Sequence, residues 1–199
     1  MVVLFVLRAK NSLSGRFRNE FQKFLWSNID AQWTLQSGIT VKIESHAEWV
    51  IYNDIFVEGE YDLPIKYALH SKSSGGTLNF LDLGANVGFF TLRVADLVLQ
   101  DTLFNLPFNV TLVEGSLAVY KKLSWRLKDQ PALTKKISIV HGLVGERQGS
   151  AKIFETDFHV MNAILTDAKS KGTEVHYIDL VSLYGDEVPE IDLLKCDIE

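Results

Sequence analysis

Cysteine is almost absent from this chain of 199 residues, which contains only Cys196. A lone cysteine excludes an internal disulfide and any metal site built from several cysteines. Because Cys196 lies in an apolar stretch, we interpret it as a small buried residue rather than a nucleophile.

An excess of positive charge is lacking as well. The chain has 20 basic against 25 acidic residues, and its formal net charge of −5 argues against a protein that binds nucleic-acid phosphates. Basic residues cluster at positions 8–23 and 121–136, and we interpret both clusters as water-facing sides of helices. We therefore expect no nucleic-acid partner.

Long hydrophobic runs are missing too. The apolar stretch at residues 1–7 is far shorter than the roughly 20 residues that span a bilayer, and no basic region precedes it as in a secretory signal. We expect no membrane partner and a cytoplasmic location. Hydrophobic residues still make up 47% of the chain, enough for the core of one domain with or without an N-terminal extension.

The first third of the chain predicts a mixed α+β extension. Apolar residues at helical spacing indicate a helix over residues 17–25, and residues 62–70 predict a second helix. Residues 40–43 and 49–57 are rich in β-branched and aromatic residues and predict strands. A polar, glycine-containing linker at residues 71–76 divides the chain into an N-terminal extension, 1–76, and a core, 77–199.

The core alternates between strand and helix patterns. Strands are predicted at 78–82, 110–114, 137–140 and 191–198, with helices at 88–99 and 117–127 between the first three. Short strands at 151–154 and 174–178 and a helical turn at 180–184 are further expectations. This alternation predicts an α/β, Rossmann-like, doubly wound and mostly parallel sheet with right-handed crossovers.

The most informative stretch is residues 80–90, Phe-Leu-Asp-Leu-Gly-Ala-Asn-Val-Gly-Phe-Phe. It reads as a buried strand, a sharp turn of small residues and the start of a helix, which together build a cofactor site at the carboxyl edge of a parallel sheet. Asn86 suits the turn because asparagine tolerates left-handed backbone. A dinucleotide fingerprint would need glycine at 84, 86 and 89, but positions 86 and 89 are Asn and Phe.

The loop from Gly84 to Gly88 instead resembles the G-x-[GN]-x-G loop of class I methyltransferases, which bind S-adenosylmethionine. Glu114 ends the next predicted strand, where a carboxylate can accept hydrogen bonds from both hydroxyls of a ribose. Two more segments extend the resemblance: residues 54–62, with Glu-Gly-Glu-Tyr-Asp, and residues 191–199, with Asp-Leu-Leu-Lys-Cys-Asp-Ile-Glu. Together these motifs resemble the FkbM family of S-adenosylmethionine-dependent methyltransferases over roughly residues 54–199.

This resemblance implies a set of cofactor-binding residues. Asp82 would act near the methionine end of the cofactor, directly or through water, and Glu114 would hold the ribose. Glu60 and Tyr61 would close over the cofactor. The alternative is that Glu60 is an exposed acid in a turn and that Tyr61 is a ring packed in the core. The remaining members shape the loop or border the adenine: Gly84, Ala85, Asn86, Gly88, Gly115, Ser116, His141 and Gly142. For His141, a loop histidine without a special role is an equal alternative.

Asp197 and Glu199 are the candidate catalytic residues. They follow the last predicted strand, where the acceptor should approach, and strand alternation places both on one face. A base, a metal pair or acceptor-orienting groups remain open, and two carboxylates are too few to define a metal site. Since acceptors in the family are often hydroxyls of sugars or natural products, we expect O-methylation of a small-molecule or glycan acceptor.

Two other functions remain open: a non-catalytic Rossmann-like binding module and an NAD-dependent oxidoreductase. The chain stops at Glu199, before the Gly-Ala-Glu with which the family motif continues. In the class I fold the fourth strand lies centrally, whereas here it would form an uncovered apolar edge. We therefore expect the C-terminal strands of the fold to be missing. Nothing in the sequence indicates an oligomeric state.

Overall fold

The N-terminal part folds into helices and a two-stranded hairpin. The computed structural model describes residues 15–72, 75–101, 106–133, 135–146, 149–154, 163–165, 172–185 and 188–198. The first elements are α2 (Gly15–Asn28), β1 (Ala31–Thr34), β2 (Thr40–Ile43), α3 (His46–Tyr52), the π-helical turn η2 (Asn53–Val57) and α4 (Asp62–Ser71). β1 and β2 pair antiparallel. The helices predicted at 17–25 and 62–70 and the strand at 40–43 are confirmed, whereas β1 was not anticipated.

The strand predicted at residues 49–57 is wrong, because this segment is helical. Ser45 caps α3 by accepting a hydrogen bond from the Glu48 amide at 3.2 Å, and α3 continues directly into η2. Trp49, Tyr52 and Phe56 recur at helical spacing, and the ring of Tyr52 stacks on Phe56 at 4.9 Å and on Trp49 at 6.1 Å. Packing on one helix face thus outweighs the strand preference of aromatic residues.

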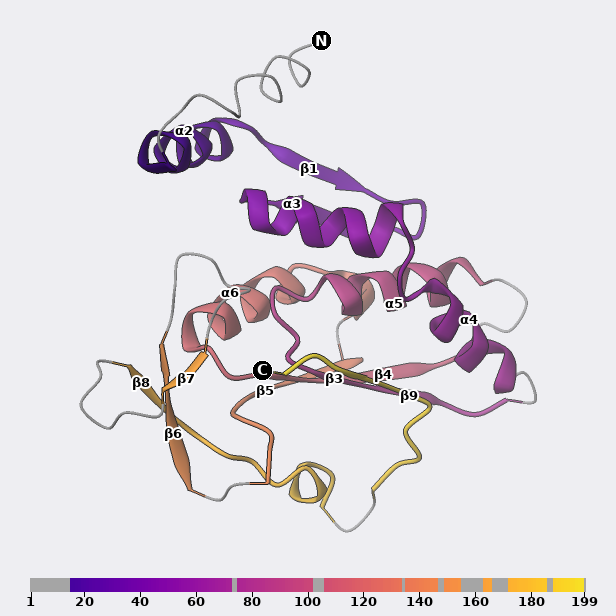
Figure 1. The fold of residues 1–199 in the computed structure, drawn as a ribbon. Coiled ribbons are helices and arrows are strands. Elements are labelled where there is room, and N and C mark those ends of the chain that lie inside the picture. The colour runs from indigo at the N-terminus through magenta and orange to yellow at the C-terminus, as the bar shows by residue number, and fades with distance from the viewer. Residues whose placement is uncertain are drawn as a thin grey trace.

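A four-stranded parallel sheet forms the centre of the fold (Figure 1). Its elements are β3 (Leu78–Leu83), α5 (Phe89–Gln100), β4 (Phe108–Glu114), α6 (Leu117–Lys128), β5 (Ile137–His141) and β9 (Leu193–Cys196). The strand order is β5-β4-β3-β9, so the chain winds outward from β3 and then returns to place β9 on the other side of β3. This order confirms the doubly wound, Rossmann-like α/β fold and puts the reversal of winding between β3 and β9.

The main hydrophobic core lies between the sheet and the helices α4, α5 and α6, which cover one face (Figure 1). It includes Phe80, Leu112 and Leu123, all at most 1% exposed. Ile39 and Val41 of the N-terminal part belong to the same cluster. Residues on both sides of the 71–76 linker therefore share one core, and the division of the chain at residue 76 stays a prediction.

The opposite face of the sheet carries a smaller cluster of Leu81, Leu83 and Val113. The segment that contains the turn η5 (Val181–Leu183) covers it, and the helical turn predicted at 180–184 is confirmed. A second sheet of antiparallel strands, β6 (Ser150–Phe154), β7 (Ala163–Leu165) and β8 (Thr173–His176), stands beside the first. β6 and β8 confirm the predicted short strands, while β7 and the turn η3 (Pro131–Leu133) were not anticipated.

Among the residues described, β9 forms an edge of the parallel sheet. Its side chains alternate between half-buried and exposed, with Leu194 53% exposed. Cys196 is exposed, so its predicted burial is wrong. The physical reason is that its side chain projects from an edge strand, where fewer neighbours cover it. No helix in the described part of the chain is both long and apolar enough to cross a membrane.

Candidate functional site

The turn after β3 has the left-handed backbone that its sequence predicts. Gly84, Asn86 and Gly88 all have positive φ, of 74°, 50° and 87°. The amides of Gly84 and Ala85 both donate to the carbonyl of Val113 on β4 at 3.0 Å, which fastens the turn to the carboxyl edge of the sheet. α5 begins directly after Gly88.

Glu114, at the end of β4, lies against this turn. Its Oε2 accepts a hydrogen bond from the Asn86 amide and its Oε1 accepts one from the Ser116 amide, both at 2.8 Å. Burial raises the pKa of the Glu114 carboxyl, and these bonds partly oppose the rise. The structure therefore brings Glu114 and the loop together, as a shared site requires.

The polar atoms left over at this point are hydrogen-bond acceptors. The Glu114 carboxylate accepts backbone hydrogen bonds from Asn86, Ser116 and Gly115, while its two oxygens offer about four acceptor sites, so it keeps acceptor capacity. Asn86 Oδ1 is buried and has no partner among the residues that the structure describes. A group that fits here must donate hydrogen bonds, and adjacent sugar hydroxyls have that property.

The residues after β4 and β5 meet beside Glu114. The Gly142 amide donates to the Glu114 carbonyl at 3.1 Å, and Nε2 of His141 lies 2.9 Å from the Gly115 carbonyl. Ser116 caps α6, its side chain accepting from the Val119 amide. The predicted adenine-bordering residues are therefore neighbours at one edge of the sheet.

Packing accounts for both glycines in this group. A Cβ on Gly115 would lie 2.9 Å from the side chain of Leu143, and one on Gly142 would lie 2.5 Å from that of Ile178. Real Cβ atoms do not approach neighbours so closely, so a larger residue at either position would force these side chains to shift.

Asp82 is fully buried, at 0% exposure, and faces Lys195 of the neighbouring strand β9. Its Oδ1 accepts from Lys195 Nζ at 3.2 Å, and its Oδ2 accepts from the Thr91 hydroxyl at 3.4 Å. Burial raises the pKa of Asp82, and the charge of Lys195 opposes this. Burial alone would lower the pKa of Lys195, but the charges of Asp82 and Asp197 raise it. The Asp82 carboxylate therefore faces Lys195 rather than solvent.

Lys195 is the site residue that sequence reasoning missed. It pairs in register with Asp82 across β3 and β9, two strands that are distant in the chain. The alternation of apolar and charged residues at 194–197 shows that Lys195 and Asp197 share a strand face, but it does not show which strand they lie beside.

The remaining predicted residues surround this pair at varying distance. Asp197 has a side chain that is 72% exposed, with Oδ2 3.6 Å from Lys195 Nζ. The ring of Tyr61 packs edge-on against Phe90 at 5.2 Å, and burial together with the charge of Glu60 raises the pKa of Tyr61. Glu60 itself is exposed. Glu199 lies outside the described residues.

A second buried ion pair supports the loop from the helix side. Arg126 on α6 donates to the Val87 carbonyl and to Glu48 Oε2, both at 2.9 Å. Arg126 is 4% exposed and Glu48 is 1% exposed. Lys122 also donates to Glu48. The N-terminal part therefore contacts the candidate site through α3 and this arginine.

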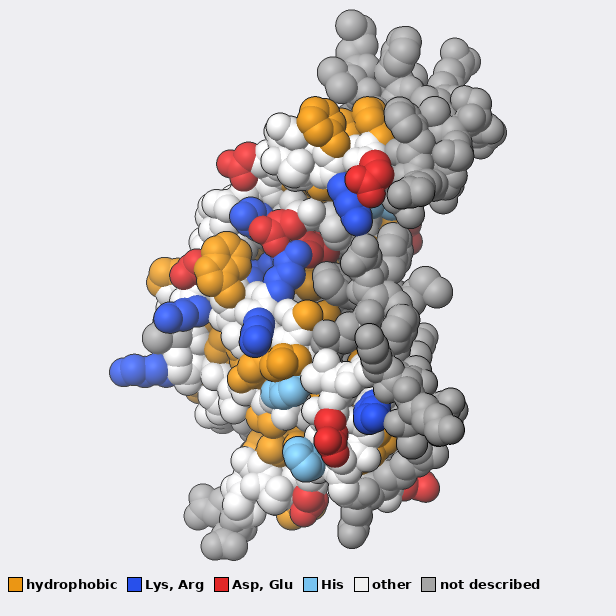
Figure 2. All heavy atoms as spheres, turned by 90° about the vertical axis from the view of Figure 1, so that its left-hand side faces the viewer, with side chains coloured by type: hydrophobic (Ala, Val, Ile, Leu, Met, Phe, Trp, Pro, Cys, Tyr) orange, Lys and Arg blue, Asp and Glu red, His pale blue; other side chains and the backbone are white. Residues whose placement is uncertain are grey.

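Charges elsewhere are interspersed. On the face drawn in Figure 2, acidic and basic side chains alternate among those described rather than gathering by sign. A groove of about 880 Å³ lies between α2 and the segment from β2 to α3, and another of about 460 Å³ is lined by residues 144–146, 149 and 177–180. In the described part of the chain, no group of three or more His, Cys, Asp or Glu side chains could hold a metal ion.

Comparisons with known proteins give weak likenesses. No protein-family model matches the chain, and no curated protein matches it. One similar solved structure is YjhP from E. coli, with 13% identity, a TM-score of 0.28 and coverage of 43% of this chain and 33% of that one. Another is a putative protein-L-isoaspartate O-methyltransferase from Plasmodium falciparum in complex with S-adenosyl-L-homocysteine, with 18% identity, a TM-score of 0.30 and coverage of 57% and 45%.

The chain thus spans between a third and a half of these two structures. Likenesses of this strength say nothing about function. The fold rests on the strand order, and the function rests on the residues at the carboxyl edge of the sheet.

Proposed function

We propose that this chain is an S-adenosylmethionine-dependent methyltransferase whose cofactor binds at the carboxyl edge of the parallel sheet. The observation that carries the proposal is the bond of 2.8 Å between the Asn86 amide and Glu114 Oε2. It joins the acid at the end of β4 to the left-handed turn after β3. Open α/β sheets bind nucleotide-type ligands at this carboxyl edge.

Each part of the ligand has candidate residues. Glu114 would accept hydrogen bonds from the ribose hydroxyls, and Gly115, Ser116, His141 and Gly142 would border the adenine. Asp82 would act near the methionine end, as the sequence predicts directly or through water; its contact with Lys195, which binds the Gly84 carbonyl, adds a route through the loop. When bound, S-adenosylmethionine supplies an activated methyl group on a sulfonium, so the protein contributes mainly proximity and alignment.

We further propose that the acceptor is a hydroxyl of a small molecule, a sugar or a natural product, as the resemblance to the FkbM family suggests. The exposed carboxylate of Asp197 stands at the carboxyl end of β9, beside the switch between β3 and β9. From there it would orient the acceptor hydroxyl or remove its proton, the step that O-methylation requires of a positioned base. Glu199 is proposed for the same role from the sequence motif.

Calorimetric titration of the chain with S-adenosylhomocysteine and, separately, with NADH tests the proposal. Binding of S-adenosylhomocysteine without binding of NADH is the expected result. Binding of NADH alone would favour an oxidoreductase, and binding of neither would favour a non-catalytic module.

A further inference from the structure

Lys195 connects the buried end of β3, the cofactor loop and the end of β9. Its Nζ lies 3.2 Å from Asp82 Oδ1, 3.1 Å from the Gly84 carbonyl and 3.6 Å from Asp197 Oδ2. An ammonium group has three N–H donors, and here three oxygens surround it. Hydrogen bonds to Asp82 and Gly84 engage two of these donors, and the third faces Asp197 at ion-pair distance. The Lys195 side chain is 9% exposed, so little of it is open to a ligand.

We propose that Lys195 is a positioning residue, which ties the loop after β3 to the carboxyl end of β9 and thereby sets the affinity for the cofactor. This inference rests on the proposed function for the nature of the ligand. The tie itself is a property of the protein and can be measured without any ligand.

Backbone contacts at the same point show how closely the loop and β9 fit. The Asp197 amide donates to the Leu83 carbonyl at 2.9 Å. A Cβ on Gly84 would lie only 2.0 Å from the Asp197 carbonyl oxygen. The backbone just after β9 therefore lies directly against Gly84, and Lys195 of β9 binds the Gly84 carbonyl.

Asp82 gives Lys195 its fixed position. An unpaired carboxylate at 0% exposure would be strongly unfavourable, so Asp82 requires the lysine, and the lysine is drawn beneath the loop. The charges here are two carboxylates and one ammonium, with the surplus negative charge on exposed Asp197. Asp82 thus acts on the loop through Lys195.

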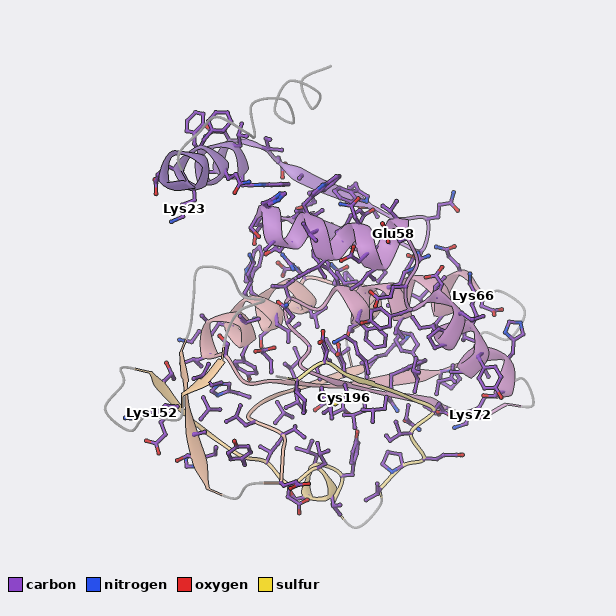
Figure 3. All side chains as sticks on the ribbon, viewed as in Figure 1. Lys23, Glu58, Lys66, Lys72, Lys152 and Cys196 are labelled. Atoms are coloured by element: carbon purple, nitrogen blue, oxygen red, sulfur yellow. The ribbon has the colours of Figure 1, made fainter. Side chains whose placement is uncertain are left out.

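The other end of β9 offers a matched control. Lys72 forms an ion pair with Asp192 at 2.9 Å, and Asp192 also accepts from the Asn79 amide at 2.8 Å. This pair anchors the amino end of β9, whereas Lys195 anchors the carboxyl end; Figure 3 labels Lys72 and Cys196 at these two ends. A lysine that merely holds β9 in the sheet would behave like Lys72.

The experiment compares the wild type with Lys195→Met, the double variant Asp82→Asn/Lys195→Met, and Lys72→Met. The single Lys195→Met variant leaves Asp82 buried without a cation and is expected to unfold at lower temperature. The double variant removes both charges together and is expected to fold. Its Gly84 and Ala85 amides should exchange with deuterium faster than in the wild type, in the absence of ligand.

Affinity for S-adenosylhomocysteine is the second readout. The double variant should bind it at least about tenfold more weakly, which corresponds to ~1.4 kcal/mol. Lys72→Met should keep the exchange rates of Gly84 and Ala85 and the affinity of the wild type. This contrast separates a tie to the loop from a general contribution to stability.

Four results would overturn the proposal. Three concern the double variant: it does not fold, it folds but its Gly84 and Ala85 amides exchange at the wild-type rate, or it folds but binds S-adenosylhomocysteine with wild-type affinity. The fourth is that Lys72→Met weakens this binding as much as the double variant does. If the wild type itself does not bind S-adenosylhomocysteine, the proposed function fails, and the exchange of Gly84 and Ala85 still decides the role of Lys195.

Discussion

Replacing Glu114 by alanine is the most direct perturbation of the candidate site. The change removes the two oxygens that accept from the amides of Asn86 and Ser116, each at 2.8 Å. Hydrogen bonds to charged groups contribute about 1.5–3 kcal/mol each. Because burial raises the pKa of Glu114, holding its charge offsets part of this gain. We therefore expect the free energy of unfolding to fall by about 3 kcal/mol, the lower end of the sum for two bonds.

The effect on binding is a separate quantity. A carboxylate that accepts hydrogen bonds from ribose hydroxyls should contribute about 1.5–3 kcal/mol to the cofactor complex. The Glu114→Ala variant should therefore bind S-adenosylhomocysteine about 10- to 100-fold more weakly. The affinity of Glu114→Gln should lie between those of the wild type and Glu114→Ala, because the single amide oxygen of glutamine can replace one of the two carboxylate oxygens as acceptor.

Acidification of the wild type should weaken binding as the Glu114→Ala change does, but it should not reproduce the loss of stability. The pKa of Glu114 is raised in the folded protein, so the folded state takes up a proton at a pH where the unfolded chain is still ionised. The contribution of Glu114 to stability therefore falls as pH rises from the pKa of this group in the unfolded chain toward its raised pKa in the folded protein. Binding should change in the opposite direction, weakening as pH falls through the raised value, because the neutral carboxyl is a poorer acceptor for hydroxyls.

Urea denaturation and calorimetry of the Glu114 variants measure the two quantities. Glu190→Ala serves as control, since that carboxylate is 83% exposed and lies near the amino end of β9. It should change stability by no more than about 0.5 kcal/mol. A folded Glu114→Ala protein with wild-type stability and wild-type affinity would refute the assignment of Glu114 to both the loop and the ligand.

Four further changes test other parts of the structure. Gly84→Ala should lower the free energy of unfolding in urea by at least about 1–2 kcal/mol from the left-handed backbone alone, with an additional loss from the contact with Asp197; unchanged stability would show that β9 does not lie over the loop. Arg126→Met should cost about 3 kcal/mol in the same measurement, as expected when one partner of a buried ion pair is removed, and a neutral result would argue against the contact with Val87. Burial alone would raise the pKa of Glu44, but hydrogen bonds from two lysines lower it from 4.5 to about 2. The stabilising contribution of Glu44 should therefore be lost as pH falls through that range. Glu44→Gln should flatten the dependence of the melting temperature on pH there, and an unchanged slope would contradict the pairing. Leu194 is an exposed apolar side chain on the edge strand β9, so we expect the wild type to self-associate in light scattering and Leu194→Lys to self-associate less; a monomeric wild type, or equal scattering of the two proteins, would show that the edge does not mediate contacts.

Much of the local structure is readable from neighbouring residues. The pattern Gly-Ala-Asn-Val-Gly predicts left-handed backbone, and Gly84, Asn86 and Gly88 have it. Alternating strand and helix patterns predict the parallel sheet, which the strand order confirms. These features follow from backbone preferences and from apolar periodicity within a few residues. The same local reasoning fails at residues 49–57, because aromatic side chains there pack on one face of a helix, although aromatic residues are also common in strands.

Contacts between distant residues decide the rest. The sequence alone determined that an acid ends each of two neighbouring strands and that small residues form the turn between strand and helix. Only the tertiary structure pairs Lys195 with Asp82, 113 positions away, and thereby turns the acid of β3 inward while the acid of β4, Glu114, meets the loop. The physical reason is that strand register and edge position depend on which segments pack together, and no local preference encodes that choice.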